Sequence, residues 1–297
     1  MHSKLANLLI RPRLTQMCSS LRVTESIGKS TSLFGRKAEE FLNIRITETE
    51  SFNDIVGNNI TCSKHDLDAT LKDLLLENFD RDSVRTYKPQ LHKDLPKHAQ
   101  TFLYKLSTVV NNNHVQVEPA HVEDYIHDLM DNVLKAAGFE DGTDLILMPC
   151  MLRLYIGSES LAAYADREGR RGTEIIWVLD EDKHKFDRRW KRGDIQLIAN
   201  MIAAAQTNET TLGIVYPRNV LGIKFDADCL YFYSARVTKE YLDELTAGEQ
   251  PGPLVVYKFP QKRQLSLSIV KDRGEIFTYL GALRQYALTL DALYADA

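Results

Sequence analysis

A short run of acidic residues and one lysine follows an apolar stretch near the middle of the chain. Residues 174–179 read Glu-Ile-Ile-Trp-Val-Leu, which predicts a strand, and Asp180-Glu181-Asp182-Lys183 follows directly. Side chains alternate across a strand, so Glu181 and Lys183 share one face while Asp180 and Asp182 share the other. A carboxylate beside an ammonium group fits phosphodiester hydrolysis. The carboxylate holds Mg²⁺ (or Mn²⁺), and the lysine orients or activates water.

A metal site needs a further carboxylate from upstream, because Mg²⁺ prefers oxygen ligands. The glycine-flanked run 169–172 predicts a turn that places position 160 opposite Glu181. Glu159 fits this place and is the first candidate for the upstream acid. Asp166 has the right chemistry but lies nearer the turn, so it ranks second.

A third acid is expected on a helix that begins near Pro119. Apolar residues recur there at helical spacing, and the stripe comprises Val122, Ile126, Leu129 and Val133. Glu123 flanks this stripe and can reach a site at the sheet edge. The alternative is an ordinary first-turn acid favoured by the helix dipole.

The order of the remaining elements indicates the fold class. The expected strands are residues 145–148, 151–156, 160–165, 174–179, 212–216, 220–225, 229–235, 254–259 and 265–270, and the expected helices in this half are 119–138, 195–206, 239–245 and 276–294. The central order of helix, three strands, helix and strand predicts an α/β (α+β) fold, with a mixed central sheet flanked by helices.

The chain divides unevenly at about residue 117. Residues 1–117 are expected to be a mostly helical or partly disordered extension, and residues 118–297 a single domain. Residues 1–24 contain no acid and four Lys/Arg, which fits either a transit-type segment or a basic tail. The four cysteines are far apart, which argues against a zinc site of short Cys pairs and favours reduced thiols in an intracellular compartment.

The net charge of −4 does not indicate a nucleic-acid binder, but the local charge does. Residues 167–192 hold nine Lys/Arg against six Asp/Glu. Within them, the segment 184–192 mixes basic and aromatic residues and is expected to follow a phosphate backbone. The candidate nucleic-acid-binding residues are Lys185, Arg188, Arg189, Lys191 and Arg192. A flexible, solvated loop is the alternative.

In this region the sequence resembles the PD-(D/E)XK (restriction-endonuclease-like) nuclease superfamily. The triplet 181–183 matches ExK, either Glu159 or Asp166 matches the upstream acid, and Glu123 lies on the leading helix. Gln196 lies in the helix after the triplet and resembles the polar residue that many members place beside the metal. Residues 177–233 are also similar to fungal and oomycete Crinkler-type effector domains.

The resemblance implies a divalent-metal-dependent endonuclease acting on nucleic acid, with DNA favoured over RNA. The implied catalytic residues are Glu159, Glu181, Lys183 and Gln196, and the implied metal ligands are Glu123, Glu159, Asp166 and Glu181. No Pro-Asp pair precedes the triplet, which departs from the superfamily pattern. An inactive nuclease-fold effector or binding module therefore stays the alternative, with a host nucleus as its place of action if the Crinkler resemblance holds.

Overall fold

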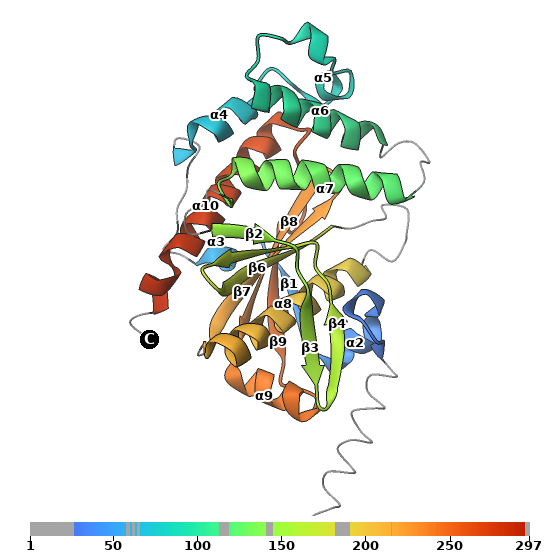
Figure 1. Ribbon diagram of the computed structural model, residues 1–297, viewed down its shortest axis with the longest axis vertical. Helices are drawn as coiled ribbons and strands as arrows, with labels where there is room; N and C mark the ends of the chain where they lie inside the picture. The colour runs from blue at the N-terminus through green and yellow to red at the C-terminus, as the bar shows by residue number, and fades with distance from the viewer. Residues whose placement is uncertain are drawn as a thin grey trace, which may run out of the picture.

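The structure has three layers, with a mixed sheet between helices on both faces (Figure 1). This computed structural model describes residues 27–57, 60, 63, 66–112, 119–140, 145–181, 191–214 and 216–294, and for residues 119–123, 181, 191–192 and 291–294 it describes the backbone alone. The expected α/β (α+β) class with a mixed central sheet flanked by helices is confirmed.

The central sheet has eight strands in the order β1-β9-β8-β7-β6-β5-β2, with β10 paired to β8 off this path. Its strands are β1 (Ile44–Glu48), β2 (Leu145–Met148), β5 (Arg167–Arg171), β6 (Glu174–Glu181), β7 (Arg218–Asp226), β8 (Cys229–Val237), β9 (Leu254–Phe259) and β10 (Leu265–Ser266). The pairs β1–β9 and β6–β7 are parallel, and the others are antiparallel. Parallel neighbours need a crossover, which α8 (Lys191–Leu212) supplies between β6 and β7.

Each face of the sheet has its own apolar core. One core includes Trp177 and Leu179 of β6 and is covered by α6 (Lys97–Asn112), α7 (Pro119–Ala136) and α10 (Val270–Tyr294). The other includes Val178 and is covered by α8. From Trp177 to Leu179, successive side chains of β6 therefore point to opposite cores, whereas Ile176 joins the same core as Trp177, beside the irregularity in the β5–β6 pairing. None of the helices in the described ranges is both long enough and apolar enough to cross a membrane.

Shorter helices complete the two outer layers. They are η1 (Thr31–Leu33), α2 (Arg36–Phe41), α3 (Asn53–Val56), α4 (Ala69–Leu75), α5 (Arg81–Arg85), η3 (Pro89–Leu91) and α9 (Lys239–Ala247). Buried residues of α3, α4 and α5 join the core under α6 and α7, whereas those of α2 and α9 join the core around α8.

Helix α8 is buried on almost every side. It lies between the central sheet and a separate hairpin made of β3 (Leu152–Ile156) and β4 (Glu159–Ala163). A helix in such a place needs apolar residues all round, as its Ala-, Ile- and Met-rich sequence provides. Gly222 of β7 allows close packing, since a Cβ there would lie 2.8 Å from Sδ of Met201.

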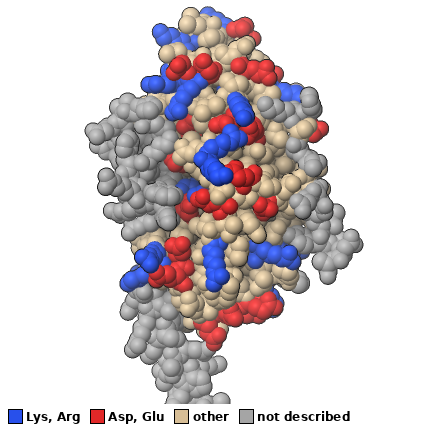
Figure 2. Space-filling view, turned by 180° about the vertical axis from the view of Figure 1, so that it is seen from behind, with Lys and Arg blue, Asp and Glu red and all other residues tan. Residues whose placement is uncertain are grey.

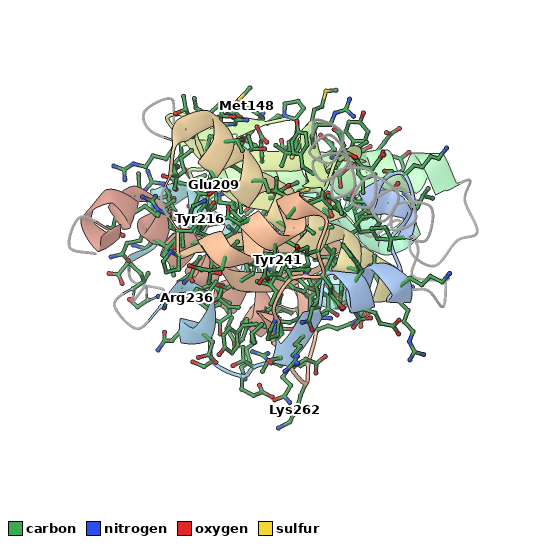
Figure 3. All side chains as sticks on the ribbon, turned by 90° about the horizontal axis from the view of Figure 1, so that it is seen from below. Met148, Glu209, Tyr216, Arg236, Tyr241 and Lys262 are labelled. Carbon is green, nitrogen blue, oxygen red and sulfur yellow. The ribbon has the colours of Figure 1, made fainter. Side chains whose placement is uncertain are left out.

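The described residues before position 118 contribute to both apolar cores. Strand β1 pairs with β9 along its whole length, from Ile44 with Leu254 onward. The hydroxyl of Tyr241 on α9 donates to the carbonyl oxygen of Leu42 at 2.9 Å. In Figure 3, Tyr241 lies near the middle of the molecule, whereas Lys262 lies at its rim. The expected N-terminal extension thus contributes an edge strand, which the sequence did not indicate.

Candidate active site

The polar end of β6 is the centre of the candidate site. Residues 175–179 of this strand are buried, and the strand ends at Asp180 and Glu181. Strand β5 runs antiparallel to it, with Arg167 opposite Leu179. The amide of Asp166 donates to the carbonyl oxygen of Leu179 at 2.9 Å. The start of β5 therefore brings Asp166 alongside the acidic end of β6.

Helix α7 contacts the start of β5. His127 Nε2 lies 3.8 Å from Asp166 Oδ1, and the Asp166 side chain is 20% exposed. Arg167 forms a bidentate ion pair with Asp131 of α7, with Nε–Oδ1 and Nη2–Oδ2 distances of 3.0 and 2.8 Å. These contacts fix the start of β5 against α7. Glu123 lies one turn before His127 on the same helix.

Asp180 is held on the opposite side, against α8. Its carboxylate is buried and accepts from Nδ2 of Asn200, at 3.1 Å to Oδ1 and 3.0 Å to Oδ2. The same Nδ2 lies 3.2 Å from the carbonyl oxygen of Tyr164. The hydroxyl of Thr31 donates to Asn200 Oδ1 at 2.9 Å. Asn200 thus joins the end of β6 to the segment that leads into β5.

Replacing Asn200 by aspartate should make stability depend on pH in a new way. Two buried carboxylates would then face each other, so the pKa of one of them should lie well above the ordinary carboxyl range. A pKa raised on folding costs stability as pH increases above the unfolded value of about 4. Urea unfolding should show a loss relative to wild type that grows to about 2–4 kcal/mol by pH 8. A loss of the same size at pH 4.5 and pH 8 would contradict the contact.

The expected position of Glu159 is wrong. Glu159 begins β4 and pairs with Ile156 in the separate hairpin, so it does not lie opposite Glu181. Strand β4 extends from Glu159 to Ala163, which is about 13 Å at about 3.3 Å per residue, and Asp166 follows only after its end. The error arises because residues 167–171 form a strand rather than a turn, which moves the partner of β6 along the chain. Asp166, ranked second from the sequence, is the candidate acid that lies beside β6, because its amide donates to the carbonyl oxygen of Leu179.

The structure places the other candidates only in part. Gln196 is partly exposed on α8, and Asn200, one turn later, donates to the Asp180 carboxylate at the end of β6. The backbone alone is described for Glu123 in α7, Glu181 in β6, and Lys191 and Arg192 in α8, while Lys183, Lys185, Arg188 and Arg189 lie outside the described residues. On the face seen in Figure 2, basic and acidic side chains intermingle, so no extended patch of one sign appears there.

A buried ionic cluster next to the site was missed from the sequence. Asp194, in the first turn of α8, accepts from Lys224 Nζ at 2.9 Å, from Lys258 Nζ at 2.7 Å and from the Tyr233 hydroxyl at 2.9 Å. All four residues are buried. Burial acts to raise the pKa of Asp194, but the two lysines hold it below its usual value. Lys224 pairs in register with Asp180, so the cluster adjoins the end of β6. The sequence did contain a signal for this cluster, namely a lysine within each of the apolar strands β7 and β9.

The Asp166 carboxylate is an oxygen donor, the type of ligand that a magnesium ion prefers. Within the ranges that the structure describes, no three His, Cys, Asp or Glu side chains gather closely enough to hold a metal. Asp166 nevertheless presents a partly exposed carboxylate at the end of the sheet. Mg²⁺ is usually bound through one or two carboxylates together with several waters. Asp166 is a donor of this kind, and for Glu181 the structure describes the backbone alone.

In comparisons with known proteins, no protein-family model and no curated protein matches the sequence.

Proposed function

We propose that this protein is a divalent-metal-dependent endonuclease that hydrolyses phosphodiester bonds, with DNA favoured over RNA. The observation that supports this proposal is the β5–β6 pairing, which brings Asp166 beside the acidic end of β6. The ExK triplet 181–183 begins at this end. An upstream acid and an ExK strand end are the parts that the proposed chemistry requires.

The candidate residues divide into metal ligands and a lysine that acts on the attacking water. Asp166, Glu181 and Glu123 would hold Mg²⁺ or Mn²⁺, which when bound makes water a stronger nucleophile and offsets charge on the phosphate. Lys183 would orient the attacking water and stabilise the negative charge that develops on phosphate oxygens. The water oxygen bonds to phosphorus as the bond to the leaving oxygen breaks.

Binding of the substrate backbone is assigned to the basic segment after the triplet. Lys185, Arg188, Arg189, Lys191 and Arg192 would contact phosphates, and Gln196 would lie near the metal. Phosphate contacts of this kind make affinity strongly dependent on salt.

A plasmid cleavage assay tests the proposed function. Wild type and Lys183→Ala are incubated with supercoiled plasmid in Mg²⁺, Mn²⁺ or EDTA. Nicking that needs the metal and is lost in the variant is expected. If neither protein cuts plasmid, single-stranded DNA or RNA, the catalytic proposal fails in this form, and a nuclease-fold binding module becomes the better account.

A further inference from the structure

The β3–β4 hairpin has one buried face and one exposed face. Burial alternates strictly along β3, and β4 follows the same pattern with Glu159 and Ala162 partly exposed. The buried residues are Leu152, Leu154, Ile156, Leu161 and Ala163, which belong to the core around α8. Because α8 holds this inner face, the outer face is fixed toward solvent (Figure 1). The outer-face residues are Met151, Arg153, Tyr155, Ser160, Ala162 and Tyr164.

The outer face combines exposed apolar and aromatic groups with one basic residue. Met151, Tyr155 and Tyr164 are 76, 41 and 52% exposed. Arg153 is exposed as well, and none of the outer-face residues is acidic, although the chain has 41 Asp/Glu against 37 Lys/Arg. Exposed apolar and aromatic groups gathered on one face typically mark an interaction site. The basic residue and the lack of acids favour a partner with negative charge.

The pairing register arranges these side chains in a row. Tyr155 lies opposite Ser160, and Arg153 lies opposite Ala162. Tyr164 follows directly after the end of β4. Arg153 therefore lies between Tyr164 and Tyr155 along the hairpin, about 6.6 Å from each, which is the length of two strand residues. At the Tyr164 end, the row reaches the candidate site. Tyr164 precedes Asp166 by two residues, and its carbonyl oxygen lies 3.2 Å from Nδ2 of Asn200.

We propose that the outer face of this hairpin binds single-stranded nucleic acid and leads the strand toward Asp166. Bases stack on the rings of Tyr164 and Tyr155, while Arg153 contacts a phosphate between them. Stacking on aromatic side chains suits unpaired bases, because each presents an open face. The inference rests on the proposed function in one respect, since it names the form of nucleic acid that the same site receives.

Binding and cleavage are measured separately to test this surface. The probe is a fluorescein-labelled 12-nucleotide oligothymidylate, followed by fluorescence anisotropy with the full chain in EDTA. Tyr164→Ala and Tyr155→Ala should each weaken binding at least about fivefold, because each removes one stacking platform. Tyr164→Phe keeps the ring and should bind like wild type. Tyr257→Ala is the matched control, since Tyr257 is an exposed tyrosine, 38% accessible, on β9 of the central sheet and not on the hairpin.

The outcomes separate this surface from the proposed reaction. Equal affinity of wild type, Tyr164→Ala and Tyr155→Ala overturns the inference, and so does a wild type that fails to bind the oligonucleotide. The inference is supported if both alanine variants of the hairpin lose binding while Tyr164→Phe and Tyr257→Ala keep it. If wild type binds in this tyrosine-dependent way yet cuts nothing with Mg²⁺ or Mn²⁺, the reaction is wrong and the surface stands.

Discussion

Replacing Asp194 by alanine should lower the free energy of unfolding by about 3–5 kcal/mol, the usual cost of breaking a buried ion pair by removing one partner. The Asp194 carboxylate accepts hydrogen bonds from Lys224, Lys258 and Tyr233, and all of these groups are buried. Without it, two ammonium groups stay in the core between α8 and the sheet with their shared counter-charge gone. Such a loss is a large part of the stability of an ordinary domain.

Urea or guanidinium unfolding measures this loss, and the chain contains a matched control. Asp243 also accepts from a lysine, with Lys239 Nζ at 2.8 Å, but on an exposed helix surface. Exposed ion pairs contribute little because water and salt screen them. Asp243→Ala should therefore leave the unfolding midpoint almost unchanged. A midpoint shift in Asp194→Ala no larger than in Asp243→Ala would contradict the importance of the cluster.

The same cluster predicts how stability responds to acid. Lys224 and Lys258 hold the pKa of Asp194 below its usual value despite burial. A lowered folded pKa gives stability that is present above the unfolded value of about 4 and is lost as pH falls through the folded value. The difference between wild type and Asp194→Ala should therefore narrow below about pH 4. A constant difference from pH 7 to pH 2.5 would show that charge is not its origin.

Replacing Asp166 by asparagine should reduce metal-dependent cleavage by at least about 100-fold, on the order seen when a group that stabilises transition-state charge is removed. The substitution keeps the size of the side chain and removes its charge. The amide of Asp166, which pairs with the carbonyl oxygen of Leu179, is unchanged. The fold should therefore survive, and the loss should appear in kcat rather than in stability.

Glu159→Gln is the matched variant for this experiment. Both changes turn a carboxylate into an amide, but Glu159 lies at the far end of the β3–β4 hairpin. Its cleavage rate should stay within about twofold of wild type, as expected for a residue without contact to the reacting groups. A large loss in Glu159→Gln with normal activity in Asp166→Asn would restore the interpretation first drawn from the sequence.

The elements around the site differ in how well the sequence predicts them, for physical reasons. Strand β6 and helix α8 bury long apolar runs, and their periodicity is therefore visible in the sequence. Strand β5 has the composition Arg-Glu-Gly-Arg-Arg, which is typical of a turn. It is a strand because of its tertiary contacts: it pairs with β2 and β6, and Arg167 pairs with Asp131 of α7. Within the strand, Glu168 pairs with Arg170 at 2.6 Å. Gly169 makes room for Trp177, whose ring atom would lie 2.0 Å from an added Cβ.

The polar residues that surround the end of β6 were visible in the sequence but not interpretable alone. Asn200 stands among Ala, Ile and Met in a helix that is buried on almost every side, and its own side chain is buried, so it needs an internal partner. Lys224 and Lys258 likewise lie in apolar strands, and their buried ammonium groups also need internal partners. Which groups they meet depends on the pairing of β6 with β7 and of β8 with β9, which are contacts between distant segments.

Calorimetric titration with Mn²⁺ tests the central claim most directly, because it needs no substrate. Wild type should bind Mn²⁺ saturably, and Glu159→Gln should bind it equally well. Asp166→Asn should bind at least about tenfold more weakly, as when one ligand of a few is lost. Equal Mn²⁺ affinity in wild type and Asp166→Asn would contradict a metal site built from the start of β5 and the end of β6.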